Sequence, residues 1–227
     1  MSRWLILLVF FIASLAQAET VAVIGTGNVG MALGTEFAGL GHTVIYGSRS
    51  PQSLKTMDLV AKTGERASAA LPAEAAADAD VVILAVPGMV TEAVAKGLGD
   101  LAGKIIIDAT NPLKRAGEVL QFEYGVATSN GQIVQALHPE AFVVKAYNTI
   151  SWQSMIDPGE PAPIMPIAGN NDVAKSKVTV WASAMGLDTI DIGGIQHARV
   201  TEQMVVLMLN NQFSDKPKYA IDFRKLD

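Results

Sequence analysis

The chain has 227 residues and a formal net charge of −5, half of its residues are hydrophobic, and it has no cysteine. This length suits one domain with a well-buried core, and the acidic balance without a Lys/Arg cluster argues against a nucleic-acid partner. The lack of cysteine excludes thiol nucleophiles, disulfides and thiolate metal sites. Because the three histidines are scattered along the sequence, we expect no metal site.

The first eighteen residues have the pattern of a secretory signal peptide. Arg3 precedes an apolar run at Trp4–Phe11, and small residues lead to the triplet AQA at 16–18. The run is shorter than the ~20 residues of a membrane span. We predict a signal peptide at residues 1–18, cleaved after Ala18, and a periplasmic or secreted protein. The alternative is a membrane-anchored form, whose remaining chain would also face outward.

Strand-like and helix-like stretches alternate through residues 19–227. Strands are predicted at Val21–Ile24, Thr43–Tyr46, Val81–Val86, Lys104–Ile107, Phe142–Ala146, Ile164–Ile167 and Thr189–Ile192. The clearest helices are predicted at Met31–Leu40, Ser53–Lys62, Thr91–Leu98, Val173–Met185 and Thr201–Leu209, with a short helix in Ala67–Ala79. This alternation predicts a single α/β domain, a Rossmann-type doubly wound fold with a mostly parallel sheet.

The segment GTGNVG at residues 25–30 follows the first strand and opens the first helix. In that context the pattern G-x-G-x-x-G predicts a dinucleotide-binding turn. Gly25 would permit the tight turn, Gly27 would let a pyrophosphate approach the backbone, and Gly30 would let helix and strand pack closely. The pyrophosphate would bind the free N–H groups at the helix start.

The second predicted strand leads into Gly47-Ser48-Arg49, where an NAD-binding protein would carry an acidic residue for the ribose hydroxyls. A carboxylate would repel a 2′-phosphate, whereas the Arg49 guanidinium can bind one bidentately and Ser48 can donate a hydroxyl hydrogen bond. These two residues predict a preference for NADP(H).

Other strand ends would form the rest of the crevice, because ligands of open α/β sheets bind beyond the carboxyl ends of the strands. Asn111 and Asn148 follow two of these strands and are candidates to bind the nicotinamide carboxamide or the ribose. The alternative is that both asparagines only stabilise turns through local hydrogen bonds.

Six segments resemble those of NADPH-dependent deazaflavin-coenzyme (F420) oxidoreductases, in the same order: VAVIGTGNVGMALG, VIYGSRSP, IIIDATNPL, VVKAYNTISW, GNNDVAKSKV and DIGGIQHARVTE. They are similar also to the NADPH domain of the six-transmembrane metalloreductases. The resemblance implies a Rossmann domain that binds NADP(H) and presents the nicotinamide to a flavin-like ring. By position it implies NADP(H) contacts at Thr26, Asn28, Val29, Ser48 and Arg49, and a nicotinamide end lined by Val86, Pro87, Asn111 and Asn148.

We therefore expect an oxidoreductase that transfers a hydride between NADP(H) and a flavin or deazaflavin (F420). Such a transfer needs no side-chain acid or base, since both partners are cofactors, and no catalytic side chain is assigned. His197 is the best-placed histidine for a site, and Arg199 and Glu202 can pair at one-turn spacing.

Two other functions stay open: a non-catalytic NADP-binding accessory protein of the periplasm, and an NADPH-dependent reductase of a small imine or keto substrate. The expected partners are small-molecule cofactors, a membrane-side redox protein, and a second copy of the chain that pairs through Thr201–Leu209.

Overall fold

The computed structural model describes residues 18–117 and 119–213. The predicted signal peptide therefore lies outside the described residues except for Ala18, as does the end of the chain from residue 214. Among the described helices, none has both the length and the hydropathy needed to cross a bilayer.

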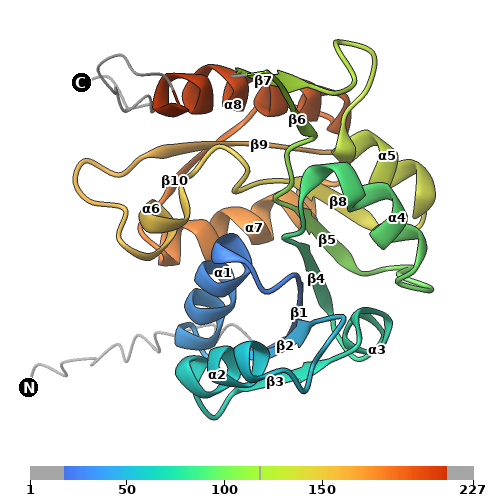
Figure 1. The fold of residues 1–227 in the computed structure, drawn as a ribbon, viewed down its shortest axis with the longest axis vertical. Coiled ribbons are helices and arrows are strands. Elements are labelled where there is room, and N and C mark those ends of the chain that lie inside the picture. The colour runs from blue at the N-terminus through green and yellow to red at the C-terminus, as the bar shows by residue number, and fades with distance from the viewer. Residues whose placement is uncertain (1–17, 118, 214–227) are drawn as a thin grey trace, which may run out of the picture.

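Eight strands form one sheet in the order β10-β9-β8-β5-β4-β1-β2-β3 (Figure 1). A separate antiparallel hairpin, β6–β7, projects beside the last helix. The strands are β1 Thr20–Ile24, β2 Thr43–Gly47, β3 Ala67–Ala70, β4 Val81–Leu84, β5 Ile105–Asp108, β6 Leu113–Ala116, β7 Val119–Phe122, β8 Phe142–Lys145, β9 Ile164–Gly169 and β10 Asp188–Asp191.

The six neighbouring strands β3, β2, β1, β4, β5 and β8 are parallel to one another. Strand β9 runs antiparallel to β8, and β10 is parallel to β9. The chain moves outward in one direction from β1 to β3 and then crosses back to β4, so the strand order reverses between β1 and β4. A ligand crevice is expected at this switch point, beyond the carboxyl ends of the strands. The predicted α/β fold and mostly parallel sheet are confirmed.

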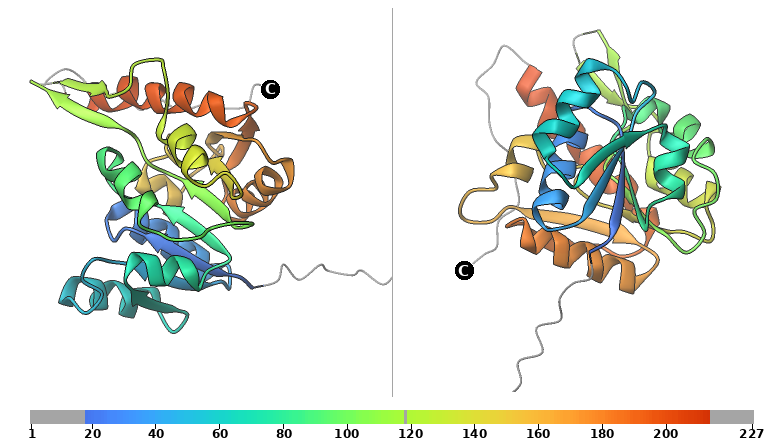
Figure 2. Two further views of the ribbon diagram at one scale, coloured as in Figure 1. Left: turned by 90° about the vertical axis from the view of Figure 1, so that its right-hand side faces the viewer. Right: turned by 90° about the horizontal axis from the view of Figure 1, so that it is seen from below.

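Helices cover both faces of the sheet (Figure 2). One core is centred on Phe37, Met155 and Trp181, and the other on Leu98, Val134 and Ile195. The central strands are buried on both sides, which explains their nearly continuous apolar sequences. The α-helices are α1 Asn28–Gly39, α2 Leu54–Thr63, α3 Pro72–Ala77, α4 Thr91–Lys96, α5 Asn130–Leu137, α6 Trp152–Ile156, α7 Asp172–Ala184 and α8 Ala198–Phe213.

Short polar side chains set where several helices begin. Ser53, Ser129, Ser151 and Asn171 are N-caps whose side chains accept a hydrogen bond from the backbone N–H three residues on. Helix α1 differs, because its N-cap is Gly27, which has no side chain to satisfy the first N–H groups. The start of α1 therefore keeps backbone donors available for a ligand.

The structure corrects parts of the expected element order. Residues 67–79 do not form one short helix: Ala67–Ala70 pairs with β2 as an edge strand, and α3 follows with Pro72 in its first turn. The hairpin β6–β7 and helices α5 and α6 were not predicted. Each is short, and its burial depends on neighbours distant in the sequence, so local periodicity alone gives little indication of it.

Candidate functional site

The glycine-rich turn at residues 25–30 joins β1 to α1. Gly25 has φ +121°, and a Cβ there would lie 2.3 Å from the carbonyl oxygen of Ala85. A Cβ on Gly30 would lie 2.1 Å from the carbonyl oxygen of Gly25, whereas a Cβ on Gly27 would meet no atom within 4 Å. The turn therefore packs tightly on its protein side and is open where a pyrophosphate would approach the start of α1.

The next part of the crevice is the loop from β2 to α2. Ser48 Oγ lies 3.2 Å from Thr56 Oγ1, and Thr56 Oγ1 lies 3.0 Å from Ser53 Oγ at the start of α2. These hydroxyl contacts hold the loop in place. Arg49 is exposed and makes no hydrogen bond or ion pair with the described part of the chain. Its guanidinium is therefore free to bind an anion beside β2.

Two asparagines meet where β5 and β8 end. Asn111 Nδ2 donates to the backbone oxygen of Asn148 at 3.0 Å, and Asn148 Nδ2 donates to Asn111 Oδ1 at 3.0 Å. Asn148 Oδ1 and Thr149 Oγ1 are buried and have no partner among the described residues. A buried polar atom without a partner is costly. The asparagines thus bond to each other across 37 residues of sequence, and the loop after β8 holds two unsatisfied polar atoms, one on Asn148 and one on Thr149.

Tyr147 directly precedes Asn148 in the loop after β8. It is fully buried with φ +63°, a left-handed conformation that a non-glycine residue seldom adopts. Such a conformation costs about 1 kcal/mol and persists where the surroundings enforce it. Burial raises the pKa of the Tyr147 phenol far above its usual value, so this group stays protonated and is unsuited to acid–base work.

A buried ionic cluster lies behind the asparagines, and sequence reasoning missed it. Lys145 Nζ lies 2.9 Å from Asp108 Oδ2 and 2.6 Å from Glu202 Oε1, and all three side chains are 0% exposed. Lys145 also donates to the backbone oxygen of Thr110. We call Asp108, Lys145 and Glu202 the buried triad. One indication in the sequence was available, because Asp108 and Lys145 are charged residues at the ends of two otherwise apolar strands.

The triad connects three elements around the crevice. Glu202, on α8, accepts hydrogen bonds from the backbone N–H groups of Asn130 and Gly131 at the start of α5. Asn130 Nδ2 donates to Gly88 O at 2.9 Å and lies 2.8 Å from Thr110 Oγ1. The loops after β4 and β5 are thus held to the same cluster as α8.

The predicted pairing of Arg199 with Glu202 is wrong. Glu202 points into the interior toward Lys145, while Arg199 Nη1 donates to the backbone oxygen of Val126. His197 follows β10, whose end is level with the end of β8 in the strand register. Its neighbours Ile195 and Ala198 lie against Gly131 at the start of α5, and His197 Nδ1 is buried without a partner among the described residues. His197 makes no hydrogen bond with a predicted cofactor-binding residue within the described part of the chain.

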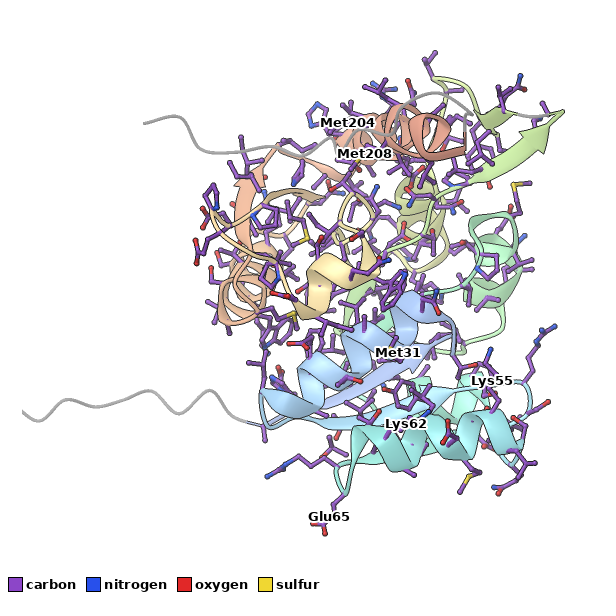
Figure 3. The ribbon with its side chains drawn as sticks, turned by 60° about the vertical axis from the view of Figure 1, so that its left-hand side comes forward. Met31, Lys55, Lys62, Glu65, Met204 and Met208 are labelled. Carbon is purple, nitrogen blue, oxygen red and sulfur yellow. The ribbon has the colours of Figure 1, made fainter. Side chains whose placement is uncertain are left out.

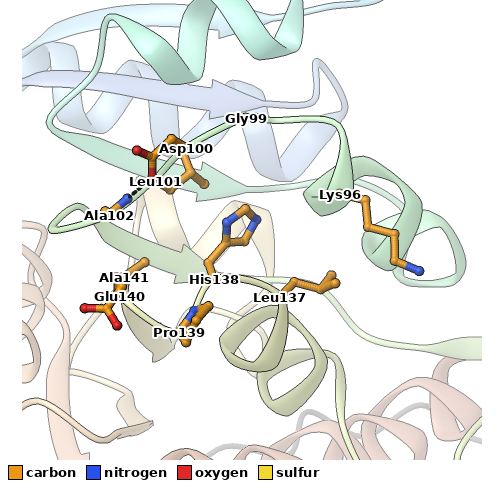
Figure 4. A pocket seen from close by; sticks show the side chains of 10 residues that line it. All are labelled: Lys96, Gly99, Asp100, Leu101, Ala102, Leu137, His138, Pro139, Glu140 and Ala141. Carbon is orange, nitrogen blue, oxygen red and sulfur yellow. Dashed lines mark hydrogen bonds between the residues drawn. The ribbon is translucent and has the colours of Figure 1, made fainter.

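A hollow of about 360 Å³ lies at the amino ends of β5 and β8, between the loops that precede these strands (Figure 4). His138 lies in its wall, and its Nε2 is 3.0 Å from the backbone oxygen of Ala95. This contact joins the loop before β8 to α4. The hollow is separate from the glycine-rich turn and the asparagine pair.

The predicted site residues thus lie on one rim of the sheet, on the loops that follow β1, β2, β4, β5 and β8. The rim has an open glycine turn at a helix start, a free guanidinium beside β2 and unsatisfied polar groups after β8. These features fit the pyrophosphate, the 2′-phosphate and the nicotinamide end of NADP(H), in that order. Contacts of individual residues with the cofactor remain predictions.

Comparisons with known proteins agree with this geometry. Residues 20–112 match the family described as NADP oxidoreductase, coenzyme F420-dependent. The crystal structure of a candidate F420-dependent NADP reductase from Arthrobacter sp. FB24 has a TM-score of 0.79 and 32% identity, and the match covers 85% of this chain and 92% of that one. The F420-dependent NADP reductase of Methanothermobacter thermautotrophicus is 26% identical over 213 residues, which are 88% of this chain and 92% of the relative.

The metalloreductase STEAP3 of Rattus norvegicus is 31% identical over 194 residues. The match covers 85% of this chain but only 38% of the rat protein, so the chain corresponds to a minor part of that relative.

The fold and these relatives identify the chain as an NADP-dependent oxidoreductase built on a single Rossmann domain. Within this class, the chain belongs to the coenzyme F420-dependent NADP oxidoreductase family, as the resemblance of its motifs predicted. NADP(H) binding is accordingly the part of the functional prediction that the comparisons confirm.

Proposed function

We propose that this protein transfers a hydride between NADP(H) and a flavin-type or deazaflavin (F420) acceptor. The carrying observation is the chemistry of the nicotinamide end. Val86, Pro87, Asn111 and Asn148 offer apolar surface and amide groups, and the buried phenol of Tyr147 stays protonated. Such a site orients a ring for direct transfer and leaves the redox chemistry to the two cofactors.

In this proposal each part of the rim has a separate task. The start of α1 binds the pyrophosphate through N–H groups that no side chain caps. Asn148 Oδ1 accepts a hydrogen bond from the nicotinamide carboxamide. This bond gives Asn148 Oδ1 the partner that it lacks within the described part of the chain. The cofactor, when bound, supplies the hydride that the acceptor receives.

Arg49 and Ser48 select the phosphorylated cofactor. A bidentate guanidinium–phosphate contact is a strong, charge-assisted interaction that NADH cannot form. We expect Arg49→Glu to weaken NADPH binding at least about tenfold while NADH binding does not weaken. Lys55→Glu, at an exposed position of α2 (Figure 3), introduces the same charge change nearby and is the matched control. Equal losses in both variants would show a general charge effect in place of a specific contact.

The acceptor is identified by following NADPH oxidation anaerobically with FMN, riboflavin, coenzyme F420 and a quinone. Turnover with a flavin or F420 supports the proposal. Turnover of an imine or keto acid without added flavin would instead identify a small-substrate reductase. Tight NADP(H) binding without turnover on any acceptor would identify a non-catalytic binding protein.

We further propose that the protein is exported and that the mature chain begins at Glu19. The leader pattern at residues 1–18 supports this, and β1 begins one residue after Glu19, so removal of the leader leaves the sheet intact. N-terminal sequencing of the protein from a periplasmic or culture fraction tests the proposal. A chain that retains residues 1–18 in the membrane fraction would favour the anchored form with a membrane-side redox partner.

We also propose a homodimer that pairs through α8. Helix α8 forms one end of the molecule together with β6–β7, and Val200 and Leu207 on it are exposed (Figure 1). Met204 and Met208 lie on the same helix (Figure 3). Sedimentation of the wild type and of Leu207→Lys tests this proposal: a dimer that the substitution converts to monomer supports it, and a wild-type monomer contradicts it.

A further inference from the structure

The buried triad lies next to the nicotinamide end along the chain and through direct contacts. Asp108 and Lys145 end β5 and β8, and each strand end leads to one of the paired asparagines three residues later. Lys145 donates to the backbone oxygen of Thr110, the residue that precedes Asn111. A charge on the triad therefore acts at short range on whatever binds the asparagine pair.

The triad carries two carboxylates and one ammonium group, so its formal net charge is one negative unit. Burial raises the pKa of Glu202 and outweighs the attraction of Lys145. The Glu202 oxygens nevertheless accept from Lys145 Nζ and from two backbone N–H groups at the start of α5, which favours the ionised carboxylate at neutral pH. Because all three side chains are fully buried, solvent screens this charge little.

Exposed charges nearby do not cancel it. Glu123 pairs with Lys114 at 2.7 Å, and Glu92 pairs with Lys96 at 2.6 Å, so both surface carboxylates have their own cations. Tyr124 is the other titratable group close to the triad. Partial burial is the main cause that raises the pKa of Tyr124, and the negative charges of Glu92, Glu202 and other carboxylates raise it further. The Tyr124 phenol therefore stays neutral. Arg199, one turn before Glu202 on α8, donates to the backbone oxygen of Val126 and forms no ion pair within the described part of the chain. Among the described residues, the triad is therefore the buried net charge of this region, and Arg199 is a partly exposed cation near it.

We propose that the buried triad shifts the bound cofactor toward its oxidised form, and so favours hydride donation by NADPH. The inference rests on the proposed function and deepens it. Loss of a hydride, one proton with two electrons, leaves the nicotinamide ring with a positive charge, while the acceptor gains the hydride and takes a proton from solvent. A fixed negative charge close to the ring stabilises the cationic form more than the neutral one.

Calorimetric affinities for NADP⁺ and NADPH test this without any acceptor. Glu202→Gln removes the charge with little change in shape. We expect it to raise the ratio of the NADP⁺ to the NADPH dissociation constant about fivefold, the factor that roughly 1 kcal/mol of lost charge interaction produces. A merely structural role would weaken both forms equally and leave the ratio unchanged.

Two matched variants control the measurement. Glu202→Asp keeps the charge and should restore the ratio to within about twofold of the wild type. Glu140→Gln removes one carboxylate at the opposite edge of the sheet, where Figure 4 shows it, and should also leave the ratio unchanged. An unchanged ratio in Glu202→Gln, or an equal change in Glu140→Gln, would overturn the proposal.

Asp108→Asn removes one charge from the same triad and replaces Glu202→Gln if that variant does not fold. The same ratio is expected to rise in Asp108→Asn as in Glu202→Gln, and an unchanged ratio in both variants would refute the proposal. Since no acceptor is present, the outcome is independent of whether a flavin or F420 is reduced, and a failure of the hydride-transfer proposal is recognised separately.

Discussion

Gly30→Ala should damage stability and nucleotide binding together. In α1, a Cβ at this position would lie 2.1 Å from the carbonyl oxygen of Gly25, where ordinary contact begins near 3.4 Å. The two segments would have to separate by roughly 1 Å or more, and inserting a methyl group into such a tightly packed contact costs about 1–3 kcal/mol. The gain in helix propensity, about 1 kcal/mol at most, offsets only part of this cost.

The shift would move the N–H groups at the start of α1 away from the pyrophosphate. We expect the NADPH dissociation constant to rise about tenfold or more, and the free energy of unfolding to fall by about 1–2 kcal/mol. Urea unfolding measures stability and calorimetry measures affinity. Gly39→Ala is the matched control, because a Cβ at the far end of the same helix meets no atom within 4 Å.

Gly39→Ala should leave affinity unchanged and stability equal or slightly higher. If Gly30→Ala binds NADPH as tightly as Gly39→Ala and unfolds at the same urea concentration, close packing at the turn does not hold the cradle, and the reasoning is wrong.

Three more predictions concern other parts of the molecule. Lys145→Met leaves Asp108 and Glu202 buried without their cation, and should lower the free energy of unfolding by about 3–5 kcal/mol in urea titrations at pH 7. The loss should shrink as the pH falls, because protonation relieves the two carboxylates. Burial lowers the pKa of His42 below 6.5, so the folded state binds fewer protons than the unfolded state. Stability should therefore decline as the pH falls through 6.5 toward the folded-state pKa, and thermal melts of His42→Asn should show less of this decline. Asn148→Ala removes the unpartnered Oδ1 and should weaken NADPH binding by about 1 kcal/mol, roughly fivefold by calorimetry, whereas an unchanged affinity would exclude this contact.

Much of the fold followed from local patterns. Val81–Leu84 and Ile105–Asp108 are apolar along almost their whole length, because parallel strands in the middle of a two-faced sheet are buried on both sides. The glycine turn was also predictable, since few backbone arrangements place glycine at all three positions between a strand and a helix. Short elements such as β3 and the β6–β7 hairpin were not, because their pairing partners, not their own residues, stabilise them.

The class of fold, the family and the cofactor could be predicted from residues 20–112 and the later motifs, because each depends on short contiguous segments whose backbone chemistry acts locally. The support of the site could not be predicted in this way. The tertiary structure paired Asn111 with Asn148 and buried Glu202 against Lys145 rather than beside Arg199. Residues so far apart in the chain meet only when the sheet register and the path of α8 bring them together, and the buried triad arises from that long-range packing.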